Sequence, residues 1–318
     1  MENENLSPEQ STAVEQEEKS AAEVAATETT VQKKIRVGYI FLAIIPVAVL
    51  IVIQTLSQTP FLIVAAKDLI DNGFYSPAVE DYVSELMHTF NDKYAFYSYL
   101  VYAVVGLIVF GIWYYKGFVK KNPKVKLSQV FGVKSIVAAV GFAVGMQFAI
   151  NAAFTLIIIM FPHALDAYME LMETAGIVDN VLITVVYAIF LGPILEELCL
   201  RGVTFGLLEK SGIKPFFIIL ITGVLFGAMH MNLVQGIYAS FLGFAIGYLR
   251  YKYRSVKLTI CMHIFFNFLG SYGMSMLEKI GLSNGMSLIL GGISLFVIVF
   301  TIVLVNGDKK AYKAPKEV

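Results

Sequence analysis

Long apolar runs, separated by short polar stretches, dominate the chain after residue 36. Most have about the 20 apolar residues that a helix needs to cross the hydrocarbon core of a bilayer. Because a helix satisfies its own backbone hydrogen bonds, which lipid cannot do, such runs predict an all-α, polytopic membrane bundle. We count eight transmembrane helices, at 37–56, 96–115, 136–161, 181–205, 215–233, 234–249, 258–277 and 285–305.

Composition agrees with this pattern. The 318 residues are 57% hydrophobic and only 15% charged, whereas soluble domains average about 25% charged residues. The formal net charge is zero, so no basic field indicates nucleic acid. The lipid bilayer is the partner that the composition predicts.

The distribution of charge among the loops orients the helices, since basic residues accumulate on the cytoplasmic side. Six lysines and no acid lie in 116–134, whereas 162–180 carries four acids and neither Lys nor Arg. Eight helices with both termini in the cytoplasm fit every loop. The division near Asn232 and Gln235 is the weakest, and an undivided run there would give seven helices and opposite termini.

Three domains follow. Residues 1–35 are rich in glutamate and predict a disordered acidic tail. Residues 36–306 are predicted to form the transmembrane domain, and residues 307–318 a basic cytoplasmic tail. No cleavable signal sequence is recognised, so the first run is expected to remain as an anchor.

Two outer loops show helical spacing of apolar residues, at 79–90 after Ser76-Pro77 and more weakly at 165–172. Both predict interfacial helices. We expect His88 and His163, which flank these stripes, to be structural only. Cys199 and Cys261 are expected to be buried apolar residues, and Gly243 with Gly247 to mark a close helix contact.

Three charged residues interrupt the fourth run: Glu196, Glu197 and Arg201. Uncompensated near a bilayer centre they would cost roughly 8–10 kcal/mol. Glu197 can pair with Arg201 at the i,i+4 spacing of one helix face, and Glu196 is then rotated by about 100°. An ionisable cluster inside the membrane predicts a functional site.

Two later runs carry matching polar groups. Phe226 and His230 are four residues apart, as are His263 and Asn267. If these faces meet Glu196, the site can hydrolyse an acyl bond: the carboxylate takes a proton from water, a histidine orients that water, and a His/Asn pair binds the oxyanion. Alternatively, Glu196, His230 and His263 could hold Zn²⁺ with one open position.

The ordered motifs Glu-Glu-xxx-Arg, Phe-xxx-His and His-xxx-Asn resemble those of the CPBP or Abi family of intramembrane proteases, which includes type II CAAX prenyl endopeptidases and bacteriocin-processing enzymes. The resemblance covers about 180–275, which we take as the protease core. It implies Glu196 and His230 as catalytic residues that activate water, and His263 and Asn267 as the catalytic oxyanion hole. It implies supporting roles for Glu197, Arg201 and Phe226, and no metal or other cofactor. Leu200 departs from the family, which usually has Phe or Tyr there.

The function expected is therefore an intramembrane endopeptidase of the CAAX-protease type, acting on a membrane-embedded or lipid-anchored peptide in a bacterial plasma membrane. The alternative is a non-catalytic bacteriocin-immunity or scaffold protein, and a proton-coupled transporter is the third reading. One feature conflicts with a simple arrangement: His230 lies about 22 Å along its run from Pro215, but His263 only about 8 Å from Leu258. Tilt, a fourth helix that continues toward Glu209, or a deep 250–257 loop would reconcile these depths.

Overall fold

The computed structural model describes residues 35–76, 78–120, 127–169, 183–279 and 281–308. Every regular element within these ranges is a helix, so the all-α prediction is confirmed. The helices lie in the unit that begins at Val37. The predicted acidic tail, apart from Ile35, and most of the predicted basic tail lie outside the described residues.

The N-terminal helices are longer than the sequence pattern predicted. The run expected to end at Leu56 instead continues as α3 through Pro60 to Asp71. A proline removes a single backbone donor, and the apolar residues after it continue the helix, so the helix end predicted at Leu56 was wrong. The elements are α2 (Val37–Leu42), α3 (Ile45–Asp71), α4 (Val79–Lys93), α5 (Ala95–Tyr114) and the π-helical η1 (Tyr115–Val119).

Helix α4 is the amphipathic helix expected after Ser76. The helix cap is Ala78, however, and the Ser76 hydroxyl instead accepts a hydrogen bond from the Ala78 N–H at 3.2 Å and donates one to Asp81. The location of α4 at a membrane interface stays a prediction. Of the second outer stripe, residues 170–172 lie outside the described residues.

The remaining runs are helical as well. The fourth run alternates between π-helical and α-helical turns, a feature that is frequent at functional sites. Its elements are η2 (Ile183–Leu191), α9 (Gly192–Glu197), η3 (Leu198–Thr204) and α10 (Phe205–Ser211). The others are α6 (Leu127–Val130), α7 (Val133–Met160), α11 (Pro215–Ala228), α12 (Leu233–Tyr253), α13 (Val256–Phe268), η4 (Leu269–Gly273), α14 (Met274–Lys279) and α15 (Asn284–Asn306).

The chain does break between the fifth and sixth runs. Helix α11 ends at Ala228, and Asn232 caps α12 by accepting a hydrogen bond from the Gln235 N–H at 3.0 Å. Five helices in the described ranges are long and apolar enough to cross a membrane: Val37–Asp71, Ala95–Val119, Val133–Met160, Val256–Leu277 and Asn284–Asn306. The number eight for the crossing helices therefore stays a prediction.

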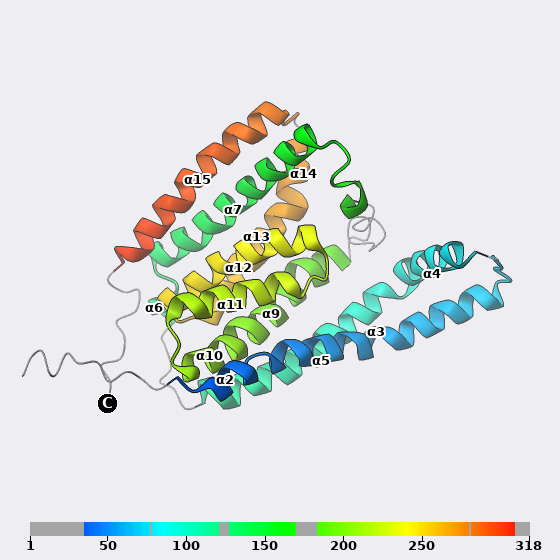
Figure 1. Ribbon diagram of the computed structural model, residues 1–318, viewed down its shortest axis with the longest axis horizontal. Helices are drawn as coiled ribbons and strands as arrows, with labels where there is room; N and C mark the ends of the chain where they lie inside the picture. Colours follow the sequence, from blue (N-terminus) through cyan, green and yellow to red (C-terminus); the bar gives the residue numbers. More distant parts are fainter. Residues whose placement is uncertain (1–34, 77, 121–126, 170–182, 280, 309–318) are drawn as a thin grey trace, which may run out of the picture. The chain divides into compact units, whose positions relative to one another are not determined.

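Small residues let neighbouring helices approach closely, as is usual in membranes. Helix α11 packs along α12, and α7 packs along α15 (Figure 1). A Cβ at Gly243 would lie 2.8 Å from the Cα of Gly223, so the predicted close contact at Gly243 is confirmed. At Gly247 the corresponding approach is an ordinary 3.4 Å.

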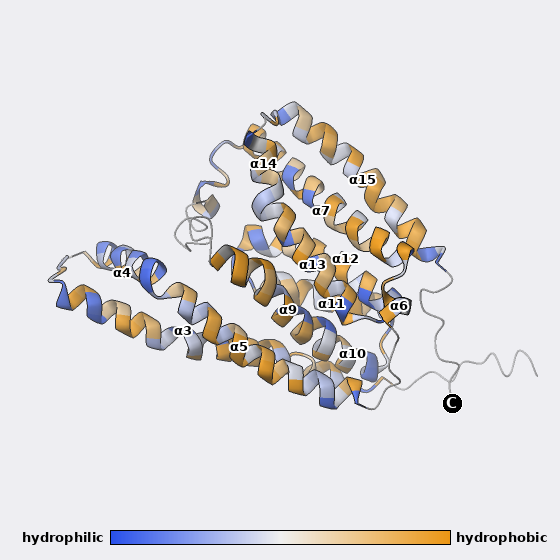
Figure 2. Cartoon of the chain, turned by 180° about the vertical axis from the view of Figure 1, so that it is seen from behind, coloured by the Kyte–Doolittle hydropathy of each residue, from blue (hydrophilic) through white to orange (hydrophobic). Residues whose placement is uncertain are grey.

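The outer faces of the bundle are apolar. Figure 2 shows hydrophobic colours along most of α15 and hydrophilic colours on α4, and Phe296 of α15 is 78% exposed. Such broad exposed apolar faces fit contact with lipid. Cys261 of α13 is exposed, so the expectation of a buried thiol was wrong there, whereas Cys199 is buried.

Candidate active site

The helix that carries Glu196 changes register just before it. In a π-helical turn the carbonyl of Ala188 would pair with the N–H of residue 193, but that residue is proline and has no N–H. The side-chain amide of Asn267 supplies the missing donor, at 2.7 Å from the Ala188 oxygen. The passage from η2 to α9 is thereby tied to α13.

Glu197 and Arg201 form a fully buried ion pair, with Nη1 2.9 Å from Oε1. The pairing predicted from their spacing is therefore present in the structure. The guanidinium also donates to the Gly243 carbonyl of α12 at 3.0 Å. A buried charge is costly unless it is paired and hydrogen-bonded, so this pair joins α9 and η3 to α12.

His263 lies between the two glutamates. Its Nδ1 donates to Glu197 Oε1 at 3.1 Å, and its Nε2 lies 3.7 Å from Glu196 Oε2. Glu197 is fully buried, but the Glu196 side chain is 20% exposed. The two adjacent carboxylates thus differ: Glu197 is held by Arg201 and His263, while Glu196 is open to the cavity.

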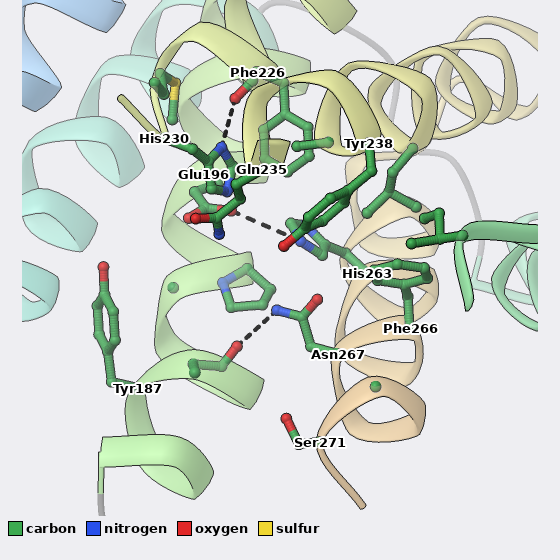
Figure 3. A pocket seen from close by; sticks show the side chains of 18 of the residues that line it. Tyr187, Glu196, Phe226, His230, Gln235, Tyr238, His263, Phe266, Asn267 and Ser271 are labelled. Carbon is green, nitrogen blue, oxygen red and sulfur yellow. Dashed lines mark hydrogen bonds and ion pairs between the residues drawn. The ribbon is translucent and has the colours of Figure 1, made fainter. Parts of the chain in front are cut away.

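The sequence predicted that His230 lies within a helix, but it lies in the turn after α11. Its Nδ1 nevertheless contacts the Phe226 carbonyl at 2.8 Å. Because a carbonyl can only accept, Nδ1 carries the proton and Nε2 remains available as an acceptor in the neutral ring. The side chains of Glu196, His230 and His263 point toward the same part of the cavity (Figure 3).

The buried ring of Phe226 packs edge-on against both imidazoles. Its centroid lies 5.1 Å from that of His230 and 5.3 Å from that of His263, in T-shaped contacts. The guanidinium of Arg201 lies 4.8 Å from the same centroid. The ring thereby separates the ion pair from the cavity and sets the spacing of the two histidines.

Two features bear on the expected difference in depth between the histidines. Ser255 and Val256, in the connection between α12 and α13, are 7% and 3% exposed, whereas Arg254 and Lys257 beside them are exposed. The fourth run continues past Glu209, since α10 ends at Ser211. The longer fourth helix is therefore present, and the depth of each histidine in a bilayer stays a prediction.

The three-ligand zinc arrangement is not formed. Within the described ranges, no three His, Cys, Asp or Glu side chains are placed to hold one ion. His88 and His163, expected to be structural, are 69% and 90% exposed and lie beside Asp92 and Asp166.

A cavity of about 570 Å³ opens beside Glu196. All four residues predicted as catalytic line it, as does Phe226, whereas Glu197 and Arg201 lie behind its wall. Most of its other polar lining was missed by sequence reasoning and includes Gln54, Tyr99, Tyr102, Gln147, Asn151, Tyr187, Gln235 and Tyr238. Gln54, Gln147 and Asn151 are carboxamides inside apolar runs, and that signal was available in the sequence.

Comparison with known proteins addresses the same segment. Residues 178–269 match the model of the "Type II CAAX prenyl endopeptidase Rce1-like" family. This segment is similar to the Rce1-like family. The match contains Glu196, His230, His263 and Asn267, and it agrees with the core of about 180–275 expected from the motifs.

A relative of the Rce1-like segment occurs in Bacillus subtilis (strain 168), under the description "Putative membrane peptidase YdiL". It is 30% identical over 92 residues, which are 29% of this chain and 37% of that protein. The similarity thus spans little more than a third of the relative. No solved structure gives a significant match. The apolar helices and the match to a membrane peptidase family show an integral membrane protein.

Proposed function

We propose that this protein is an intramembrane endopeptidase of the CAAX-protease type. The observation that carries the proposal is the contrast between two adjacent glutamates: Glu197 is fully buried in an ion pair, and Glu196 faces a cavity beside His263. Intramembrane carboxylates are expensive and usually functional. A carboxylate left open to a cavity, with a second one fixed behind it, fits a general base better than a structural clamp.

The reaction begins with a water between Glu196 and His230. Glu196 takes a proton from this water while Nε2 of His230 accepts its other hydrogen, and the water oxygen attacks the peptide carbonyl carbon. The carbonyl electron pair moves to oxygen. The proton held by Glu196 then passes to the amide nitrogen as the C–N bond breaks, which gives an acid and an amine.

The oxyanion of the tetrahedral intermediate needs hydrogen-bond donors. His263 provides one from Nε2, which lies 3.7 Å from Glu196 Oε2 at the edge of the cavity, when that nitrogen carries a proton. Asn267 has a second amide hydrogen besides the one on Ala188. We assign His263 and Asn267 to this role.

The substrate proposed is a peptide embedded in the membrane or anchored to it by a lipid, because the cavity is surrounded by apolar helices. Loop charges support a cytoplasmic location for both termini, and we propose a bacterial plasma membrane as the site of action. The immunity or scaffold alternative predicts that the polar residues only hold helices together.

The test compares membranes from cells that produce the wild-type protein or the Glu196→Gln variant at equal levels. New peptide N-termini, identified by mass spectrometry, should accumulate only with the wild-type protein. Identical sets of termini in the two samples would overturn the proposed function and favour a non-catalytic role.

A further inference from the structure

A second buried arginine lies behind the active site. Arg250 of α12 is 7% exposed, and its Nε donates a hydrogen bond to the main-chain carbonyl of Arg201 at 3.0 Å. In the opposite direction, the guanidinium of Arg201 donates to the Gly243 carbonyl of α12. Gly243 and Arg250 are seven residues apart and so share a face of α12. The two arginines therefore link η3 and α12 twice, each through the main chain of the other helix.

The Arg250 guanidinium is held from its other side by Glu209 of α10. Its Nη2 lies 3.9 Å from Glu209 Oε2, and Arg254 Nη1 lies 3.0 Å from Oε1 of the same carboxylate. Arg254 ends α12 with a φ of 51°, a left-handed conformation that residues other than glycine rarely adopt. Such a conformation persists where the surrounding structure holds it. Arg250 is thus fixed between the carbonyl of Arg201 and a carboxylate farther along the same helical run.

Arg250 is incompletely paired for a buried cation. Its Nη1 is shielded from solvent and has no acceptor among the described residues. The centre of its guanidinium lies 5.1 Å from the centroid of the Phe205 ring, a contact that offsets only part of the cost of a buried charge. Departures from complete pairing are expected at functional sites. A role in the site therefore explains Arg250 better than a contribution to stability does.

Arg201 connects Arg250 to the catalytic candidates. Its guanidinium pairs with Glu197 Oε1, and the same oxygen accepts the hydrogen bond from His263. The second nitrogen of that imidazole lies 3.7 Å from Glu196 Oε2. A displacement of the η3 main chain at Arg201 would therefore reach His263 through the Glu197 carboxylate. Because a displacement of about 1 Å can cost about 100-fold in rate, the main-chain position of Arg201 matters for hydrolysis.

We infer that Arg250 is a positioning residue for the hydrolysis: its guanidinium fixes the main chain of η3 at Arg201, and thereby the imidazole of His263. The inference rests on the proposed peptidase function and adds a residue to its site. Arg250 does not line the cavity, so it acts on the reaction through Arg201 and not through contact with the substrate. Its loss is therefore expected to change kcat and to leave KM nearly unchanged.

The test begins with a degenerate library of hydrophobic peptides. The full-length protein in lipid bicelles is mixed with the library, and cleaved bonds are mapped by mass spectrometry. The best-cleaved peptide then serves to measure kcat and KM for the wild-type protein, Arg250→Lys and Arg250→Met, per folded protein and well below each melting temperature. Lys257→Gln is the matched control, because it also removes a positive charge close to the connection between α12 and α13, but from an exposed position.

The two substitutions of Arg250 separate its charge from its shape. Arg250→Lys keeps the charge beside Glu209 but loses the planar fork that serves two acceptors at once. Its kcat should fall at least about five-fold, the equivalent of one lost hydrogen bond, with KM within about two-fold. Arg250→Met, which has no donor, should lose about 10- to 100-fold in kcat. Lys257→Gln should match the wild-type protein in both constants.

A wild-type kcat in either Arg250 variant would overturn the inference alone, because peptide hydrolysis would still be observed. A lower melting temperature with an unchanged kcat counts as this outcome, since it is the sign of a merely structural role. If Arg250→Met does not fold, Arg250→Lys, which keeps the buried charge, decides. A rise in KM larger than the fall in kcat would place Arg250 in substrate binding and also overturn the inference. No cleavage of any peptide by the wild-type protein would overturn the proposed function and the inference together.

Discussion

The side-chain amide of Asn267 donates a 2.7 Å hydrogen bond to the main-chain carbonyl of Ala188. Pro193 cannot serve this carbonyl, and the catalytic candidate Glu196 follows one turn later. Asn267 therefore has a positioning role in addition to the oxyanion role implied by its motif.

Asn267→Ala should lower stability as well as activity. The Ala188 carbonyl is half-buried at the cavity wall, so loss of its hydrogen bond should cost about 0.5–1.5 kcal/mol, which thermal unfolding in detergent will detect as a lower melting temperature. Ser271→Ala, one turn farther along and lining the same cavity, is the matched control and should melt like the wild type. A variant Asn267→Ala with the wild-type melting temperature but reduced kcat would show that Asn267 serves the oxyanion alone.

The buried pair of Glu197 and Arg201 predicts that the stability losses of the two single variants do not add up in the double variant. Removing one partner, as in Arg201→Met, leaves an uncompensated buried charge and should destabilise the protein by about 3–5 kcal/mol. The double variant Glu197→Gln/Arg201→Met should recover part of this loss, since no ion remains. Denaturant unfolding of the two single variants and the double variant measures the coupling. Additive losses would mean that the two charges do not stabilise each other.

Phe226 takes no part in the proposed reaction, but its ring is expected to affect catalysis by positioning the two imidazoles. Phe226→Leu removes the edge contacts to both imidazoles and should reduce kcat by about 10- to 100-fold, the usual effect of small misplacements in an active site. Phe241→Leu, at an exposed position of α12, serves as the matched control and should keep wild-type kcat. Equal kcat values in the two variants would contradict a positioning role for Phe226.

The acceptor role proposed for Nε2 of His230 predicts that removal of the imidazole lowers kcat. His230→Ala removes the acceptor for the attacking water and should lower kcat about 10²- to 10⁴-fold. His88→Ala, which changes an exposed histidine beside Asp92, is the control and should have no effect. Single-turnover cleavage of a library peptide measures both. Comparable rates for the two variants would remove His230 from the mechanism.

Much of the site could be predicted from the sequence because its elements obey helical geometry. The pairing of Glu197 with Arg201 followed from their i,i+4 spacing, whereas the break near Asn232 was the weakest division that the sequence predicted. The unequal environments of Glu196 and Glu197 also follow, because adjacent residues on a helix point in different directions.

Other features depend on contacts that no local pattern contains. The link from Asn267 to Ala188 joins residues far apart in the chain, and it depends on a π-helical register that the sequence does not reveal. The sequence did not choose between tilt, a longer fourth helix and a deep 250–257 loop as the way to reconcile the depths of the two histidines. Helix α3 was predicted too short, because the first apolar run was ended at Leu56 and the helix continues to Asp71.

The central claim, that Glu196 activates water for peptide hydrolysis, is tested most directly by the Glu196→Gln variant of the purified full-length protein. Gln keeps the shape but cannot act as a base at neutral pH, so peptide cleavage should fall by about 10²- to 10⁴-fold. The melting temperature should change little, because Arg201 forms its ion pair with Glu197 and not with Glu196. Cleavage by Glu196→Gln at the wild-type rate would contradict the account.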